Sequence, residues 1–284
     1  MNAECYVSHL NRYTGTARAL AGDAAADRVA RELMERYLQA PAHMGSPYFG
    51  PAVTELLEKY CGLTGDRFAE EKELSNRFVL ERMDAIRAFA ETAEDPVYAG
   101  LQLAVLGNYI DFSALQGEVS FEKLDAMLAE AAQIRLDKQI YQQLLSDLEK
   151  AKSLLYIADN AGEIGFDRIC AEQLKKRFPE LAITFCVRGA PAANDATRSD
   201  AQAVGLPFPV IDNGSAIAGT IPELLGAEAK QALETADVIL SKGQANVETL
   251  YGSGYPIYYV FLIKCQRFMS LFQKPKLTPM LIKE

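Results

Sequence analysis

The chain has 284 residues, of which 38 are acidic and 29 basic, so its formal net charge is −9 at pH 7 and its isoelectric point is near 5.0. An acidic surface repels nucleic-acid phosphates, which excludes a general nucleic-acid-binding protein. No apolar run in the sequence approaches the length of a membrane span, and the N-terminal residues lack the basic and apolar segments of a secretory signal. We therefore expect a cytoplasmic protein without nucleic-acid or membrane partners.

Five cysteines occur at scattered positions, an odd number that does not fit a set of paired disulfides. Most of them lie within apolar patterns, as expected of small buried side chains in a reducing compartment. We therefore expect reduced core thiols at Cys5, Cys61, Cys170, Cys186 and Cys265. A chain of this length is also long enough to bury a full hydrophobic core.

Residues 1–150 are expected to be helical. Val29, Leu33 and Tyr37 recur at helical spacing, and Met34 and Leu38 widen them into one apolar stripe. Stripes of this kind form a packed core rather than a cofactor site. Three further stripes share this spacing and lie within residues 97–105, 121–131 and 136–148.

Lys72 and Asn76 lie four residues apart and therefore share one face of an expected helix. Their neighbours include the acidic residues Glu70, Glu71 and Glu73. A solvated helix face is the simplest interpretation of such a charged run. We therefore favour surface roles for Lys72 and Asn76 over a role in a functional site.

From residue 153 onward, apolar strands alternate with helical segments. This alternation predicts a mainly parallel sheet with right-handed crossovers and helices on both faces. The expected fold is a three-layer α/β/α catalytic domain over residues 151–265, preceded by a helical subdomain over 1–150 that contributes to the cleft. Residues 266–284 have no clear period, so we expect a C-terminal tail on the surface or against a partner subunit. The strands are expected at residues 153–158, 182–187, 208–211, 237–240 and 257–263.

The first of these strands ends in polar side chains. Asp159 and Asn160 follow the apolar run, and Gly162 then provides backbone freedom and room for a ligand before the next helix. In a parallel sheet, the carboxyl ends of the strands open into the crevice where ligands bind. Asp159 or Asn160 is equally suited to capping the following helix. The motif alone leaves cap and ligand roles open.

Two further strand ends repeat the pattern. Residues 182–187 lead to Arg188 and then to Asp195, and residues 237–240 lead to Lys242 and Asn246. Carboxylate and amide oxygens suit a hard divalent ion such as Mg²⁺ or Mn²⁺, whereas the two cations suit a phosphate. A metal with nearby cations neutralises an anionic substrate during group transfer.

Other phosphate-binding and hydrolytic motifs are absent from the sequence. There is no G-x-x-x-x-G-K-[ST] loop, no G-x-G-x-x-G after a strand and no G-x-S-x-G elbow. The only histidines, His9 and His43, lie far upstream of the strands. These absences argue against a Walker-type NTPase, a dinucleotide-binding enzyme and a serine hydrolase.

Four strings in one order resemble the damage-control phosphatase family, also catalogued as domain of unknown function eighty-nine. The similarity extends over nearly the whole chain and is greatest to the prokaryotic branch. Four separated motifs are a much stronger signal than any one of them. The strings are Gly107-Asn108-Tyr109-Ile110-Asp111-Phe112, Asp159-Asn160-Ala161-Gly162-Glu163, Asn194-Asp195-Ala196-Thr197 and Lys242-Gly243-Gln244-Ala245-Asn246.

The resemblance implies a metal-dependent phosphatase that acts on small phosphorylated metabolites in metabolite repair. It implies that Asp159, Asn160 and Asp195 coordinate the ion, which is Mg²⁺, Mn²⁺, Co²⁺ or Ni²⁺. Lys242 matches the family's phosphate-binding lysine, so the catalytic residues are Asp159, Asp195 and Lys242. The other residues expected at the substrate are Asn108, Asp111, Glu163, Arg188 and Asn246.

The sequence departs from the family at its start, where Cys5-Tyr6-Val7-Ser8 replaces a Cys-x-x-Cys pair that is common in the prokaryotic branch. This departure puts in doubt a thiol or second-metal role for the N-terminus. The sequence leaves open whether water or an Asp side chain attacks phosphorus. Direct attack by water is the default expectation, because the Asp-x-Asp arrangement that favours an aspartyl-phosphate intermediate is absent at Asp159.

Two rival functions remain. A carboxyl methyltransferase would need an S-adenosylmethionine-binding glycine loop, of which residues 158–162 are a poor version. A non-catalytic protein would use the same acidic cleft to bind a metal or a phosphorylated ligand. The resemblance covers several substrate classes, so sugar phosphates and damaged or phosphorylated cofactor intermediates both remain open, as do the preferred metal and the oligomeric state.

Overall fold

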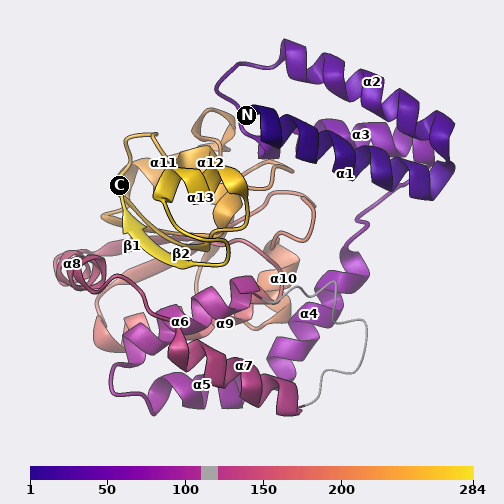
Figure 1. Cartoon of the computed structure of the whole chain (residues 1–284). Coiled ribbons are helices and arrows are strands. Elements are labelled where there is room, and N and C mark those ends of the chain that lie inside the picture. Colours follow the sequence, from indigo (N-terminus) through magenta and orange to yellow (C-terminus); the bar gives the residue numbers. More distant parts are fainter. Residues whose placement is uncertain (110–120) are drawn as a thin grey trace.

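A six-stranded sheet forms the centre of the molecule, with helices on both faces (Figure 1). The structure is a computed structural model that describes residues 1–109 and 121–284, without the side chains of residues 109, 121–125 and 127. The strand order is β3-β2-β1-β4-β5-β6, in which the first five strands are parallel and β6 is antiparallel to β5. The predicted α/β fold with a mainly parallel sheet and N-terminal helices is therefore confirmed.

The strands are β1 (Ser153–Ile157), β2 (Ala182–Val187), β3 (Val210–Asp212), β4 (Val238–Lys242), β5 (Ile257–Leu262) and β6 (Pro279–Lys283). The helices of the first half are α1 (Ala3–Ala21), α2 (Asp23–Gln39), η1 (Ser46–Phe49), α3 (Gly50–Cys61), α4 (Ala69–Glu81), α5 (Met83–Glu91), α6 (Pro96–Tyr109), α7 (Phe121–Gln133) and α8 (Lys138–Leu148). Those of the second half are α9 (Glu163–Arg177), α10 (Arg198–Ala203), η3 (Pro222–Leu224), α11 (Ala227–Thr235), α12 (Gln244–Leu250) and α13 (Gln266–Phe272).

Side chains of the central strands alternate between two apolar cores. Leu154 and Tyr156 of β1 belong to the core beneath α5, α6, α8 and α9, whereas Leu155 and Ile157 belong to the core beneath α11, α12 and α13. Figure 1 shows these two helical layers on opposite sides of the sheet. A parallel sheet covered on both faces needs strands that are apolar on both sides, which explains the continuous apolar runs in the sequence.

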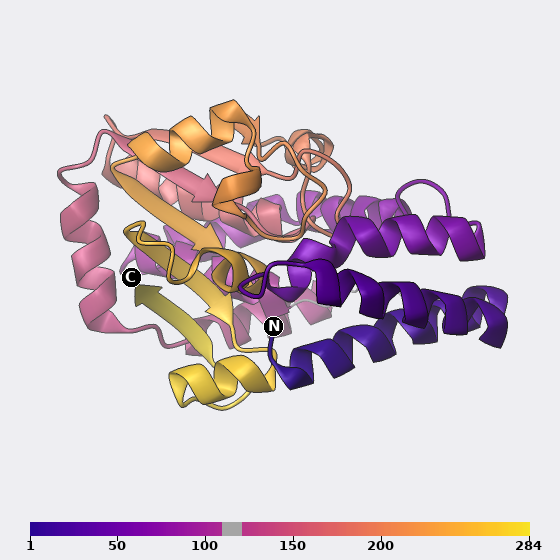
Figure 2. The same cartoon turned by 90° about the horizontal axis from the view of Figure 1, so that it is seen from above.

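Helices α1, α2 and α3 form a helical arm that projects from the sheet (Figures 1 and 2). The arm has a core of its own, to which Tyr13, Val29 and Leu33 contribute. The predicted stripe on α2 is wider than the buried face, because Met34 is 44% exposed and Leu38 is 88% exposed. Helix α2 packs mainly against α1 and α3, and Met34 and Leu38 lie outside that packed face.

The segment after residue 265, in which the sequence shows no clear period, contains regular structure. It forms α13 and then β6, whose pairs with β5 include Leu281 with Val260 and Met280 with Phe261. A five-residue strand is too short to give a recognisable period, and Pro279 stands at its first position, where a sheet tolerates proline.

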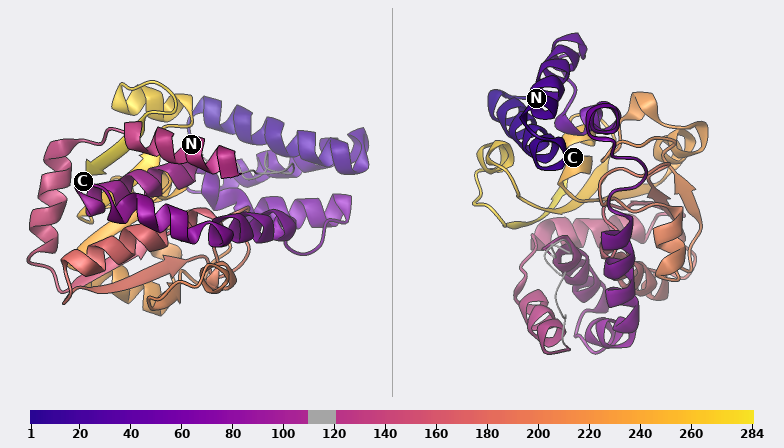
Figure 3. Two further views of the ribbon diagram at one scale, coloured as in Figure 1. Left: turned by 90° about the horizontal axis from the view of Figure 1, so that it is seen from below. Right: turned by 90° about the vertical axis from the view of Figure 1, so that its right-hand side faces the viewer.

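Helices α4, α5 and α6 pack against α9, so the first half of the chain lies directly on the second (Figure 3). All five cysteines are free. Cys170 and Cys186 are buried as predicted, whereas Cys5, Cys61 and Cys265 are only partly buried and are not core thiols. Within residues 1–109 and 121–284, no helix is both long enough and apolar enough to cross a membrane.

Candidate active site

A cavity of about 800 Å³ lies at the carboxyl ends of the parallel strands, between the sheet and the helical arm. We call this cavity the cleft. Asp159 and Asn160 follow β1 and line it together with Asp195 from the loop after β2. The two loops are joined directly, because the Ala196 amide donates to the Asp159 carbonyl at 2.8 Å and Asn160 pairs with Asp195 in a short bridge. The structure therefore brings the three predicted metal ligands to one place.

Two amide side chains hold the Asp159 carboxylate. Its Oδ2 accepts hydrogen bonds from Nδ2 of Asn108 at 3.0 Å and from Nδ2 of Asn160 at 2.7 Å. The same two nitrogens donate to Oε2 of Glu163 at 2.9 and 2.8 Å. Burial, together with the charges of Glu163 and Asp195, raises the pKa of Asp159 to about 8. The surroundings therefore disfavour the ionised form of Asp159, which a bound cation would stabilise.

Gly243 leaves space for this carboxylate. It begins the turn after β4 with φ of +76°, and a Cβ atom there would lie only 1.9 Å from Oδ2 of Asp159. Such a distance is far inside van der Waals contact. A glycine is therefore required at this position on steric grounds, in addition to its backbone conformation.

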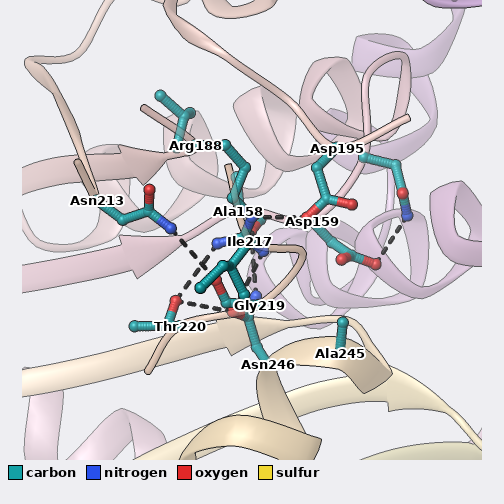
Figure 4. Close-up of polar contacts among 12 residues, drawn as sticks. Ala158, Asp159, Arg188, Asp195, Asn213, Ile217, Gly219, Thr220, Ala245 and Asn246 are labelled. Atoms are coloured by element: carbon teal, nitrogen blue, oxygen red, sulfur yellow. Dashed lines mark hydrogen bonds and ion pairs between the residues drawn. The ribbon is translucent and has the colours of Figure 1, made fainter. Parts of the chain in front are cut away.

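Arg188 fixes the Asp195 carboxylate from behind (Figure 4). Its Nε donates to Oδ2 of Asp195 at 2.6 Å, and its terminal nitrogens donate to the Ala158 carbonyl and to the side chains of Thr220 and Asn246 at 3.3 Å. Both side chains of the pair are almost wholly buried. Asn246 in turn donates to the Ala158 carbonyl at 3.1 Å and is fully buried. The positions of Arg188 and Asn246 suit holding strand ends together rather than contacting substrate.

Lys242 lies beneath the cleft rather than in it. Its Nζ donates to Glu163 and Asp167 at 2.7 Å and to the Ala104 carbonyl of α6 at 2.8 Å, so all three of its protons are used. Burial opposes the charge of Lys242, but the carboxylates of Asp167 and Glu163 outweigh it and raise its pKa. The predicted phosphate contact of Lys242 would require one of these hydrogen bonds to be exchanged.

The oxygen atoms around Asp159 fit a hard divalent cation. Two carboxylates and one amide are the ligand types that such ions prefer. Asn160 uses its Nδ2 for Asp159 and Glu163, which leaves its Oδ1 for a cation, and Oδ1 of Asn108 is buried without a partner among the described residues. No group of three His, Cys, Asp or Glu side chains suited to a metal occurs in that part of the chain, so a site here depends on Asn160.

Residues 1–277 match the family described as the damage-control phosphatase ARMT1-like domain. The chain belongs to this family. It is 34% identical over 231 residues to an uncharacterised protein of Methanocaldococcus jannaschii, covering 77% of this chain and 73% of that relative. It is 31% identical to a damage-control phosphatase of Archaeoglobus fulgidus, covering 71% of this chain and 70% of the relative.

A damage-control phosphatase of Pyrococcus horikoshii is 30% identical to this chain over 256 residues, covering 89% of this chain and 84% of the relative. The crystal structure of a protein of this family from Pyrococcus horikoshii, described there as DUF89, superposes on this chain with a TM-score of 0.83. That superposition has 25% sequence identity and covers 100% of this chain and 98% of the other. The resemblance inferred from the four motifs is thus confirmed.

The predicted surface roles of Lys72 and Asn76 are wrong, because both side chains are buried. Asn76 accepts the Gly162 amide proton at 2.7 Å and donates to Oδ1 of Asp200 at 2.8 Å, while Lys72 pairs with Asp200 at 2.9 Å. Asp200 also accepts from the backbone of Thr197. Helix α4 therefore ties together the two loops that carry Asp159 and Asp195.

Two functional candidates were not found from the sequence. Lys264 follows β5 at the same sheet edge, is exposed and lines the cleft. Its charge limits the rise in the pKa of Asp159 and helps to lower the pKa of Glu163. Its position directly after the last parallel strand was the feature of the sequence that could have identified it. Asp167 is buried on α9 and binds Lys242 and the Tyr156 hydroxyl. Asp111, a predicted substrate residue, lies outside the described residues.

Proposed function

We propose that this family member is a divalent-metal-dependent phosphatase that hydrolyses phosphomonoesters of small metabolites. The observation that carries the proposal is the convergence of Asp159, Asn160 and Asp195 on one cleft, beside the exposed ammonium group of Lys264. Two relatives named as damage-control phosphatases support the type of reaction. The proposal assigns the metal to the acidic residues and the substrate phosphate to the cleft in front of them.

Asp159, Asn160 and Asp195 are the residues that would hold the ion, with Mg²⁺, Mn²⁺, Co²⁺ and Ni²⁺ as candidates. Such an ion supplies positive charge that polarises the phosphoryl group and lowers the pKa of water. The raised pKa of Asp159 supports the assignment, because an ionised carboxylate among like charges needs a nearby cation. Asn108 and Asn160 orient that carboxylate, and Arg188 orients Asp195.

Lys264 is the cation that we assign to the substrate phosphate. It lines the cleft, is exposed, and has no hydrogen bond from its ammonium group among the described residues, whereas the ammonium of Lys242 is fully used. An ammonium group there would bind a non-bridging phosphate oxygen and offset the charge of the transferred group. Lys242 then holds Glu163 in place by a hydrogen bond. Glu163 accepts hydrogen bonds from the same Asn108 and Asn160 amides that donate to Asp159.

The overall reaction is hydrolysis by direct attack of water. A water oxygen bonds to phosphorus and the ester P–O bond breaks. The leaving oxygen takes up a proton that the water releases, so the products are inorganic phosphate and the free alcohol. The cleft volume of about 800 Å³ exceeds that of a phosphate group alone, which supports substrates of the size of sugar phosphates or phosphorylated cofactor fragments.

The test measures phosphate release from an aryl phosphate and a panel of sugar phosphates. Chelator-stripped protein receives Mg²⁺, Mn²⁺, Co²⁺ or Ni²⁺ singly, and its rates are compared with those of Asp159→Asn. We expect metal-dependent release that falls roughly 100-fold or more in the variant, because the carboxylate charge is lost. The control is Asp212→Asn, which removes a carboxylate at the end of β3 that does not line the cleft.

Unchanged metal-dependent release in Asp159→Asn would overturn the metal assignment. Tight metal binding by the unaltered protein, without release from any ester, would instead favour the non-catalytic binding protein. Equal losses in Asp159→Asn and Asp212→Asn would indicate a general effect on folding.

A further inference from the structure

The wall of the cleft that faces the metal site carries two arginines. Arg12 lies on α1, Arg67 lies in the segment between α3 and α4, and both line the cleft with Asp159 and Lys264. The two guanidinium groups flank one buried ring, because their Cζ atoms lie 5.6 and 5.7 Å from the centroid of Tyr13. Arg67 also lies 4.7 Å from the centroid of Phe68. Aromatic contacts therefore order two flexible cations at one end of the cleft.

Neither arginine has an ion-pair partner in the described part of the chain. A second hollow of about 800 Å³, between α5, α9 and β2, differs from the cleft because cations that line it are already in ion pairs. There, Arg87 and Arg168 pair with Glu172 at 3.0 and 2.8 Å, and Lys176 pairs with Glu91. In a protein of net charge −9, unpaired arginines inside a cleft are available to an anion from outside.

Two carboxylates that line the cleft, Asp66 and Glu248, are already engaged. Asp66 accepts the Phe68 amide proton at 2.9 Å and faces Lys72 at 3.4 Å. Glu248 accepts from Ser46 at 2.8 Å and from Gln244 at 3.1 Å. Among the ion pairs of the described residues, neither acid pairs with Arg12 or Arg67, and both arginines contact aromatic rings instead.

We infer that Arg12 and Arg67 form a second anion-binding subsite, so that the preferred substrates are phosphomonoesters with a second phosphate or carboxylate group. This inference rests on the proposed function, which places the reacting phosphate at Asp159, Asp195 and Lys264. Guanidinium groups bind phosphate and carboxylate oxygens in pairs of hydrogen bonds, which suits them to this task. The carbon skeleton of the substrate spans the space between the two anion sites.

The test uses two inert probes, butane-1,4-diyl bisphosphonate and butylphosphonate, whose C–P bonds resist hydrolysis. Isothermal titration calorimetry measures their dissociation constants at one free Mn²⁺ concentration. We expect the unaltered protein to bind the bisphosphonate at least about tenfold more tightly. Arg12→Gln and Arg67→Gln should each remove about fivefold to tenfold of that affinity and leave butylphosphonate binding unchanged.

Arg28→Gln is the matched control. Arg28 also lies in the helical arm, 5.7 Å from the centroid of an aromatic ring, Tyr60, but it does not line the cleft. It should alter the binding of neither probe. Equal affinity of the unaltered protein for both probes, or equal weakening of both probes by Arg12→Gln, would overturn the inference.

Phosphate release from sugar phosphates, measured on the same proteins, separates this inference from the proposed function. If the protein releases phosphate but does not distinguish the two probes, the subsite is wrong and the phosphatase stands. If it distinguishes the probes through Arg12 and Arg67 but hydrolyses no ester, the subsite stands and the phosphatase is wrong.

Discussion

The two walls of the cleft are built in opposite ways. On the sheet side, Arg188, Lys242 and Asn246 are at most 1% exposed, and each makes at least three hydrogen bonds. On the arm side, Arg12 and Arg67 are exposed, contact aromatic rings and have no ion pair among the described residues. A catalytic geometry needs fixed atoms, whereas recognition of a variable substrate tolerates side chains that adjust.

The electrostatic contrast follows the structural one. The sheet-side carboxylates are buried together, and their mutual repulsion is offset by Lys242 and Arg188. Changes there should affect folding or metal binding strongly. Changes on the arm side should affect selectivity and leave folding intact, because exposed cations contribute little to stability.

The largest effect is expected from Lys242→Met, which tests the difference between the two walls through the free energy of unfolding. The substitution leaves Glu163 and Asp167 buried without their cation, and breaking such a pair costs about 3–5 kcal/mol. Urea unfolding measures the loss. The control is Lys283→Met, which breaks a 2.7 Å pair with Asp147 that is partly exposed, at a cost below about 1 kcal/mol.

Unaltered stability of Lys242→Met combined with lost turnover would contradict this interpretation. Such a result would restore the direct phosphate contact that the sequence motif predicts for Lys242.

Gly243→Ala comes next and tests how rigid the sheet side is. The added methyl group would meet the Asp159 carboxylate, so that carboxylate must move. We expect metal affinity and turnover to fall by about 100-fold, as displaced ligands and misplaced reacting groups do. Titration of Mn²⁺ and single-turnover phosphate release would measure these losses.

Gly252→Ala controls for backbone strain in that experiment. Gly252 has φ of +88° and no atom within 4 Å of the position of an added Cβ. Both alanine variants therefore have backbone strain, but only Gly243→Ala also collides with the Asp159 carboxylate. Both should lose roughly 1 kcal/mol of stability from strain. If Gly252→Ala lost as much metal affinity as Gly243→Ala, the steric explanation would be wrong.

Asn76→Ala should have a smaller effect, because Asn76 contacts the proposed metal site only through Gly162. The substitution removes the hydrogen bond to Gly162 and the one to Asp200, so the loops of Asp159 and Asp195 become less well ordered. We expect metal affinity to fall about tenfold, with a stability loss of about 1–3 kcal/mol.

Gln102→Ala separates these two effects. Gln102 is another buried amide, whose Nε2 donates to the Ile134 carbonyl at 2.9 Å away from the cleft. It should lower stability to a similar extent and leave metal affinity unchanged. Equal metal affinities in Asn76→Ala and the unaltered protein would show that Asn76 only supports the fold.

The layout of the proposed metal site was predictable because it depends on local patterns. Apolar runs located β1 and β2, and the carboxyl ends of parallel strands must meet at one edge, which brings Asp159 and Asp195 together. The helical first half was predictable from its apolar spacing. Burial of Lys72 was not, because a charged helix face looks solvated until a partner such as Asp200 docks on it.

Lys242 shows how a small error in a strand boundary changes a functional interpretation. The strand predicted to end at Leu240 continues through Lys242, so Lys242 shares the face of Val238 and Leu240, which pack against the α6 and α9 core. Strand alternation thus directs its side chain beneath the cleft. The contact with Ala104 also depends on how α6 docks, which no local pattern reveals.

The docking of α6 has a consequence for how this protein evolves. Asn108 and Ala104, from the first half of the chain, complete the hydrogen bonds of Asp159 and Lys242 in the second half. A recombination event near residue 150 would therefore divide one polar network between two parents. Chimeras of related sequences should tolerate exchange of α1, α2 and α3, which have a core of their own, far better than exchange of α6.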